Sequence, residues 1–142
     1  MDTRGGFYIS QIKQLQDRIF DRLLKDFDLE INGPQGRILF VLWKEKRLTM
    51  GEIGARTSLA NATLTSMVDR MARRGIVKRV DGETNRRQVF VSLTDKARGM
   101  METYETVSRR MNAIFYEGFS GDEILAFEGA LSRILDNLKG QE

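Results

Sequence analysis

One stretch of the sequence decides the fold: residues 49–94, which read TMGEIGARTSLANATLTSMVDRMARRGIVKRVDGETNRRQVFVSLT. Thr49 and Glu52 open it with the spacing of a capping box, in which the two side chains satisfy free backbone N–H groups at a helix start. A helix of about two turns is expected from there to Thr57, followed by a tight connection and a second helix from Asn61 to Arg74. A short helix and a longer helix joined by a tight turn are therefore predicted.

The second half of this stretch changes from helical to strand-like spacing. Gly75 is expected to end the helix as its left-handed residue, and Thr94 to cap the helix that follows. Between them, residues 76–80 and 88–93 have strand character, and in the second run Val89, Val91 and Leu93 alternate with Gln88, Phe90 and Ser92, the pattern of a strand covered on one side. The polar residues 81–87 form the hairpin loop. Helix, turn, helix and hairpin in this order are the layout of a winged helix-turn-helix.

Long amphipathic helices are predicted on both sides of this module. The N-terminal helix is expected over residues 7–29, Pro34 begins a second helix, and Ser120 with Glu123 is another capping box. We therefore predict a mainly α protein with a small antiparallel β-wing. One domain, 1–142, contains the winged helix-turn-helix at 34–98 and dimerisation helices at 1–31 and 99–142.

The outer helices carry apolar residues at alternating steps of three and four, the pattern of helices that pack lengthwise. Together these faces exceed what one small core can cover, so a homodimer is predicted, although both could also pair within one chain. The residues expected at the dimer interface are Ile12, Leu15, Ile19, Phe127, Leu131, Ile134 and Leu138.

The composition narrows the function classes. The 142 residues include neither cysteine nor histidine, which removes disulfides, the usual zinc ligands and any imidazole base. No metal or cofactor is expected. The longest apolar run is only six residues, 38–43, so no membrane span is predicted, and the polar N-terminus does not read as a signal peptide. We expect a cytoplasmic protein that binds rather than reacts.

Charge is concentrated in the middle of the chain. Residues 56–98 carry ten basic and four acidic side chains, whereas residues 99–142 carry four basic and eight acidic ones. A basic middle between neutral and acidic ends favours a phosphate-bearing partner that contacts only that part. The alternative is that these lysines and arginines only solvate a surface.

Three segments resemble the MarR family of transcription regulators: residues 59–71, residues 74–77, and Asn85-Arg86-Arg87 followed by Leu93-Thr94. The resemblance implies a dimeric repressor or activator that is often released from DNA by small aromatic or phenolic ligands. Two positions depart from the family pattern. Asn85 replaces the acidic wing residue, so an amide hydrogen bond takes the place of an ion pair. Ala60 replaces a frequent serine, which leaves Asn61, Ser58 or a phosphate to complete the helix start.

The predicted interface with double-stranded DNA combines the recognition helix 61–74 with the wing 81–88. Short polar side chains on the outer helix face can approach base edges, and a loop arginine can enter a narrow minor groove. The predicted DNA-binding residues are Asn61, Thr63, Thr65, Ser66, Arg70, Arg73, Arg86 and Arg87. Asp69 is expected to orient Arg73 or Arg79 instead of contacting DNA.

Three aromatic residues, Phe40, Trp43 and Tyr104, are candidates for lining an effector pocket, although aromatic residues at helical spacing are more often core. Two other functions are alternatives to DNA binding. A winged-helix module that docks only proteins fits the basic middle poorly. Catalysis has little support, because the carboxylates Asp26, Asp28 and Glu30 lack a second convergent set and no phosphate-binding glycine pattern is present. No enzyme activity is predicted.

Overall fold

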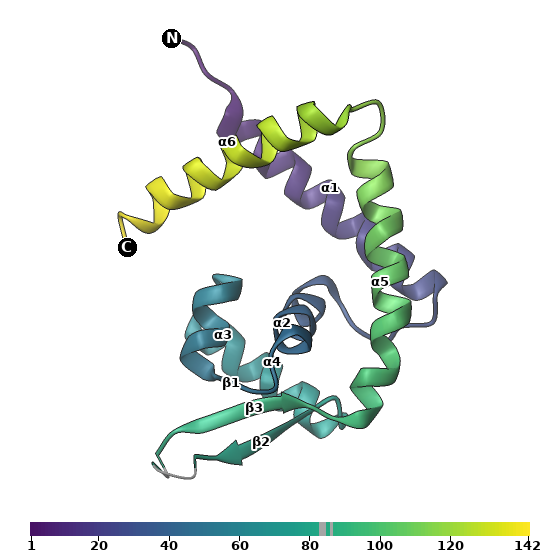
Figure 1. The fold of residues 1–142 in the computed structure, drawn as a ribbon, viewed down its shortest axis with the longest axis vertical. Helices are drawn as coiled ribbons and strands as arrows, with labels where there is room; N and C mark the ends of the chain where they lie inside the picture. The colour runs from purple at the N-terminus through teal and green to yellow at the C-terminus, as the bar shows by residue number, and fades with distance from the viewer. Residues whose placement is uncertain (83–84, 86) are drawn as a thin grey trace. The chain divides into compact units, whose positions relative to one another are not determined.

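The computed structural model covers residues 1–142 and describes all of them except 83, 84 and 86 (Figure 1). The chain divides into two compact units, Met1–Ser108 and Arg109–Glu142. Its helices are α1 (Gly5–Asp26), α2 (Gly33–Lys44), α3 (Met50–Thr57), α4 (Asn61–Arg73), α5 (Asp95–Phe115) and α6 (Gly121–Lys139). The strands are β1 (Leu48–Thr49), β2 (Val77–Asp81) and β3 (Val89–Leu93). The mainly helical fold with a small antiparallel sheet is confirmed.

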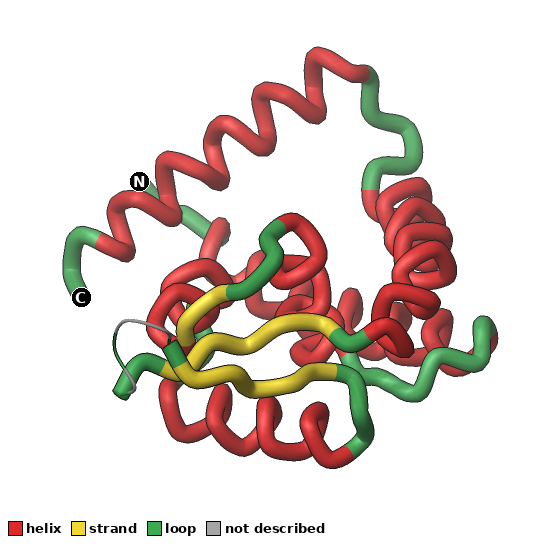
Figure 2. The backbone as a smooth tube through the Cα atoms, turned by 60° about the horizontal axis from the view of Figure 1, so that its bottom comes forward, coloured by secondary structure: helices red, strands yellow, loops and turns green. Residues whose placement is uncertain are grey.

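The sheet contains the predicted hairpin and one further strand. β2 and β3 are antiparallel with Val77 opposite Leu93, and β1 pairs with the outer edge of β3, with Leu48 opposite Val91. The order is β1-β3-β2, and Figure 2 shows the three strands side by side. β1 was not predicted, because a strand of two residues has no periodicity and depends on a partner far along the chain.

The core of the first unit lies where α2, α3, α4 and the sheet meet. α2 contacts α3 and β3, and α4 contacts α3 and β2. The side chains that fill this space are fully or almost fully buried: Ile38, Leu39, Leu42, Ile53, Leu64, Val68, Met71 and Val91. The inner face of α4 is thereby fixed against the core, so its opposite face is presented to solvent.

The boundary between α1 and α2 differs from the prediction. α1 ends at Asp26 rather than Leu29, because Asp28 adopts a left-handed φ of 58° and Leu29 N donates to Leu24 O at 2.8 Å. This is a Schellman-type stop with an aspartate in the place usually taken by glycine. α2 then begins one residue earlier than expected, at Gly33, whose N–H donates to the Asp21 carboxylate at 3.0 Å.

Both predicted capping boxes are present. At the start of α3, Glu52 N donates to Thr49 Oγ1 at 3.2 Å and Thr49 N donates to Glu52 Oε1 at 3.1 Å. At the start of α6, Ser120 and Glu123 form the same reciprocal pair. The backbone and hydroxyl hydrogen bonds from Thr49 lower the pKa of the Glu52 carboxyl below its ordinary value.

This pKa shift predicts a small acid dependence of stability. A carboxyl whose pKa is depressed in the folded state stabilises the fold above its unfolded pKa, and this contribution is lost as the pH falls through the folded value. We expect thermal stability to fall below about pH 4.5 and Glu52→Gln to remove part of that loss. Melting temperatures of both proteins between about pH 6 and pH 3 test this, and parallel curves would contradict it.

Candidate nucleic-acid interface

A tight turn between α3 and α4 positions the recognition helix. Thr57 is buried and its hydroxyl donates to Ile53 O at 2.7 Å, which closes the end of α3. Ser58 then adopts a left-handed conformation with φ 58°. Gly54 of α3 lies beside Leu64 of α4, and a Cβ at position 54 would be in ordinary van der Waals contact with Leu64 Cδ2 at 3.6 Å. These local features fix the first turn of α4 close to α3.

The start of α4 has no side-chain cap. The residue before the helix, Ala60, has an extended backbone and no side-chain acceptor, although its carbonyl accepts from Leu64 N at 2.9 Å. The expectation that Asn61 or Ser58 would cap this helix is therefore wrong, because Asn61 is already the first helical residue and Ser58 is used in the left-handed turn. The remaining alternative, that the first amides of α4 are left for a phosphate, stays a prediction.

The residues predicted for the inner and the outer face of α4 lie on those faces. Leu64, Val68 and Met71 are buried. The predicted contact residues on the helix are all exposed: Asn61, Thr63, Thr65, Ser66, Arg70 and Arg73. A shallow hollow of about 420 Å³ follows this outer face and is lined by Asn61, Ala62, Thr65, Ser66, Asp69 and Arg73. The structure thus brings four predicted residues to one hollow, while Thr63 and Arg70 lie outside its lining.

An ion pair joins the recognition helix to the wing. The carboxylate of Asp69 on α4 contacts the guanidinium of Arg79 on β2, and both side chains are partly exposed. Of the two partners considered for Asp69, the structure selects Arg79. Asp69 also lines the hollow, and its negative charge is neutralised there by Arg79.

Breaking this ion pair should slightly lower the stability of the protein and raise its affinity for DNA. We expect Asp69→Asn to lower the free energy of unfolding by at most about 1 kcal/mol, because partly exposed ion pairs contribute little. The same change frees the Arg79 charge, so low-salt affinity for random duplex DNA should rise several-fold. Urea unfolding and a filter-binding titration measure the two effects. Weaker duplex binding by Asp69→Asn would contradict the expectation.

The described part of the wing is organised by Asn85. Its side-chain oxygen accepts from Arg87 N at 3.0 Å, its carbonyl accepts from Gln88 N at 3.0 Å, and Gly82 N donates to Gln88 O at 2.7 Å. The amide hydrogen bond expected at Asn85 is therefore present, but it goes to the backbone of Arg87. Arg87 is exposed, whereas Arg86 lies outside the described residues.

A further basic residue, which was not predicted as a DNA contact, lies beside the sheet, directly before β1. The guanidinium of Arg47 lies 4.1 Å from the centre of the Phe90 ring, a cation–π distance, and places a further exposed positive charge next to β3. The sequence showed the basic residues around Arg47, but the contact of Arg47 with Phe90 depends on the pairing of β1 with β3. Arg47 is therefore an additional candidate for a phosphate contact.

The three predicted effector residues lie in different environments. Tyr104 is in the core, where its ring packs edge-on against Phe20 with centroids 5.9 Å apart, and burial raises the pKa of its hydroxyl. Phe40 and Trp43 are exposed on α2, and the Lys44 ammonium lies 5.3 Å from the Phe40 ring centre. None of the three lines the hollow of about 590 Å³ at the end of α1, whose lining includes Asp21, Lys25 and Arg74.

The predicted dimer residues leave apolar surface uncovered in both units. In the first unit Ile12 and Leu15 of α1 are 40% and 53% exposed, and Ile19 is half-buried. In the second unit Ile134 and Leu138 of α6 are exposed, whereas Phe127 and Leu131 are half-buried. Each unit therefore presents part of its predicted apolar face to solvent.

Two other kinds of site have no candidate among the described residues. That part of the chain contains no group of three or more acidic side chains placed to hold a metal ion. Its helices also include none with the length and hydropathy required to cross a membrane. What the structure does present is a helix-turn-helix, a three-stranded wing and a polar outer helix face, which together define a winged helix-turn-helix protein.

Comparison with known proteins agrees with this class. The model of the MarR family matches residues 31–89. The HTH-type transcriptional regulator TtmR of Methylorubrum extorquens (strain PA1) is 34% identical over 109 residues, which are 77% of this chain and 55% of TtmR. The chain thus spans about half the length of that relative. The HTH-type transcriptional regulator YfiV of Bacillus subtilis (strain 168) is 30% identical over 123 residues, which are 78% of this chain and 71% of YfiV. The chain belongs to the MarR family, and its curated relatives are named as transcriptional regulators rather than enzymes.

Solved structures show the same fold. A mutant of MarR from E. coli, complexed with operator DNA, superimposes with a TM-score of 0.83 at 24% identity and covers 95% of this chain and 99% of its own. BpsR of Bordetella bronchiseptica, whose DNA binding is described as regulated by 6-hydroxynicotinic acid, gives a TM-score of 0.86 at 19% identity, with 96% and 97% covered.

Proposed function

We propose that this chain is a homodimeric repressor that reads a pseudo-palindromic DNA site through recognition helix 61–74 and wing 81–88. The observation that carries the proposal is the outer face of α4, where Asn61, Thr65, Ser66 and Arg73 line one solvent-exposed hollow. Small hydroxyl and amide groups suit base edges in the major groove, and the arginine suits a phosphate or guanine. The exposed Arg87 of the wing extends the contact toward the neighbouring minor groove.

Dimerisation is supported by the apolar side chains that α1 and α6 expose. Large aliphatic residues at 40% exposure or more on several turns are unusual for a surface that stays in water. A second copy would cover them and place two recognition helices about 34 Å apart, in successive major grooves. A dimer bound over a promoter element represses by occupying it, so no further activity is required of the chain.

A small aromatic effector is proposed to release the protein from DNA. Its support is the resemblance of the chain to ligand-responsive regulators, and the regulation of BpsR by 6-hydroxynicotinic acid is a property of that protein. Exposed Phe40 and Trp43 on α2 remain the candidate contacts, and Tyr104 would have to move from its core position to join them. The proposed site of action is the cytoplasm, where a DNA-binding regulator would meet its operator.

The proposal is tested by incubating the protein with a random pool of duplex DNA, enriching the retained duplexes over several rounds, and sequencing them. We expect an inverted repeat with half-sites about one helical turn apart, and binding that weakens steeply with salt. Light scattering should report two chains per particle. If no duplex is retained even at low salt, the alternative holds, namely a winged-helix module that binds proteins without binding DNA.

A further inference from the structure

The C-terminal end of α4 is closed by a Schellman motif. Ile76 N donates to Met71 O at 2.9 Å, Gly75 N donates to Ala72 O at 3.0 Å, and Gly75 has the left-handed φ of 73°. These bonds satisfy carbonyls of the last helical turn. The carbonyls of Arg74, Gly75 and Ile76 follow the turn and need partners from elsewhere.

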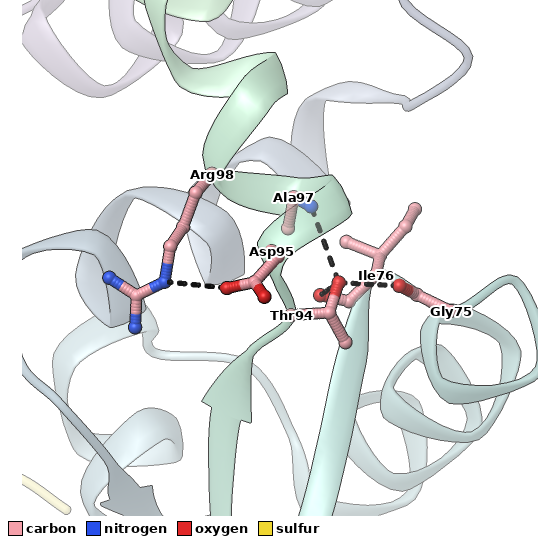
Figure 3. Close-up of polar contacts among 6 residues, drawn as sticks. All are labelled: Gly75, Ile76, Thr94, Asp95, Ala97 and Arg98. Carbon is pink, nitrogen blue, oxygen red and sulfur yellow. Dashed lines mark hydrogen bonds and ion pairs between the residues drawn. The ribbon is translucent and has the colours of Figure 1, made fainter.

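All three carbonyls accept hydrogen bonds from the start of α5. Lys96 Nζ donates to Arg74 O at 3.0 Å, Thr94 Oγ1 donates to Gly75 O at 2.5 Å, and Thr94 N donates to Ile76 O at 3.1 Å. Figure 3 shows the Thr94 side chain directed at the Gly75 and Ile76 carbonyls. The end of the recognition helix is therefore held by two residues that lie about twenty positions further along the chain.

The same hydroxyl also begins α5. Thr94 Oγ1 accepts from Ala97 N at 3.2 Å, so it caps α5 while it donates to Gly75 O. One oxygen atom thus joins the C-terminus of one helix to the N-terminus of another (Figure 3). Beside it, Asp95 and Arg98 form an exposed pair at 4.0 Å within α5. Neither helix end can move away from the other without losing a hydrogen bond at Thr94.

We propose that Thr94 is a positioning residue for DNA reading, which fixes the direction of α4 by coupling its last turn to the first turn of α5. This inference rests on the proposed function, because it concerns the angle at which the outer face of α4 meets a duplex. A change in that angle displaces the side chains of α4 relative to the bases. Base contacts tolerate a displacement of only about 0.5 Å, whereas phosphate contacts tolerate more. Loss of the coupling therefore reduces discrimination between sequences more than it reduces general affinity for DNA.

The test compares Thr94→Val, which keeps the branched shape and removes the hydroxyl, with Thr94→Ser, which keeps the hydroxyl. Ser120→Ala is the matched control, since it removes an N-cap of the same kind from α6 in the other unit. Each protein is titrated with a duplex enriched from a random pool and with the unselected pool. Thr94→Val should bind the enriched duplex about tenfold more weakly and the pool within about twofold of wild type. Thr94→Ser and the control should stay within about twofold on both.

A second measurement does not depend on DNA. Amide hydrogen exchange well below the melting temperature should become about tenfold faster in Thr94→Val at Ala97 and in the last turn of α4, and should be unchanged there in Ser120→Ala. Unchanged exchange, or equal weakening on both duplexes by Thr94→Val, overturns the positioning role. If wild type binds neither duplex, the proposed function fails, and the exchange result alone decides whether Thr94 holds the end of α4.

Discussion

Gly36→Ala is expected to destabilise the protein by about 1–3 kcal/mol, although alanine is normally the better helix former by about 1 kcal/mol. A Cβ at position 36 of α2 would lie 2.7 Å from Tyr104 Cε2 and 3.0 Å from the Tyr104 hydroxyl oxygen. Tyr104 cannot yield easily, because it is 6% exposed and its ring packs against Phe20. Urea unfolding of both proteins measures the difference in free energy.

Two further variants separate the steric cause from a general effect of glycine. Gly99 lies in α5 with open space where a Cβ would project, so Gly99→Ala should stabilise the protein by up to about 1 kcal/mol. In a Tyr104→Leu background, the penalty of Gly36→Ala should largely disappear, because the two changes share one contact. An additive double variant would show that the crowding at Gly36 has another source.

The second large effect concerns DNA. Thr65→Ala and Arg87→Ala are each expected to weaken binding to an enriched duplex about tenfold to a hundredfold, the usual range for losing one good base or groove contact. Arg87→Ala should also reduce the slope of log affinity against log salt by about one, because one phosphate-neutralising charge is lost. Thr65→Ala should leave the slope unchanged. Fluorescence anisotropy over a range of salt concentrations measures both quantities.

The matched control for Arg87→Ala is Arg133→Ala, which removes an exposed arginine from α6 in the other unit. It should alter neither affinity nor salt slope, and all variants should melt within a few degrees of wild type. If Thr65→Ala and Arg87→Ala both bind the enriched duplex as wild type does, the assignment of these residues to the interface is wrong.

Features of the fold that are set by neighbouring residues were predictable from the sequence. The capping box at Thr49 and the left-handed Gly75 each depend on a few consecutive positions, and both are confirmed. The end of α1 was misplaced because its left-handed residue is Asp28, a residue type that takes this conformation only in particular surroundings. Local patterns therefore located the helices, with errors at ends that lack the usual residue.

Features that join distant positions were only partly predictable. Spacing along α4 could not choose between Arg73 and Arg79 as the partner of Asp69, because the choice depends on where β2 lies relative to the helix. The strand β1 and the contact of Arg47 with Phe90 were missed for the same reason. Thr94 was expected to cap α5, but its second bond, to Gly75, appears only when the hairpin closes.

The exposed aliphatic faces of α1 and α6 have a consequence for how the protein responds to its own abundance. In the proposed dimer, folding and pairing share one equilibrium, so the melting temperature rises with total protein concentration. At low cellular copy number, separated chains would be both less stable and unable to span two half-sites. Occupancy of the operator would then depend on roughly the square of the protein level, which gives a sharper threshold for repression than a monomer could provide.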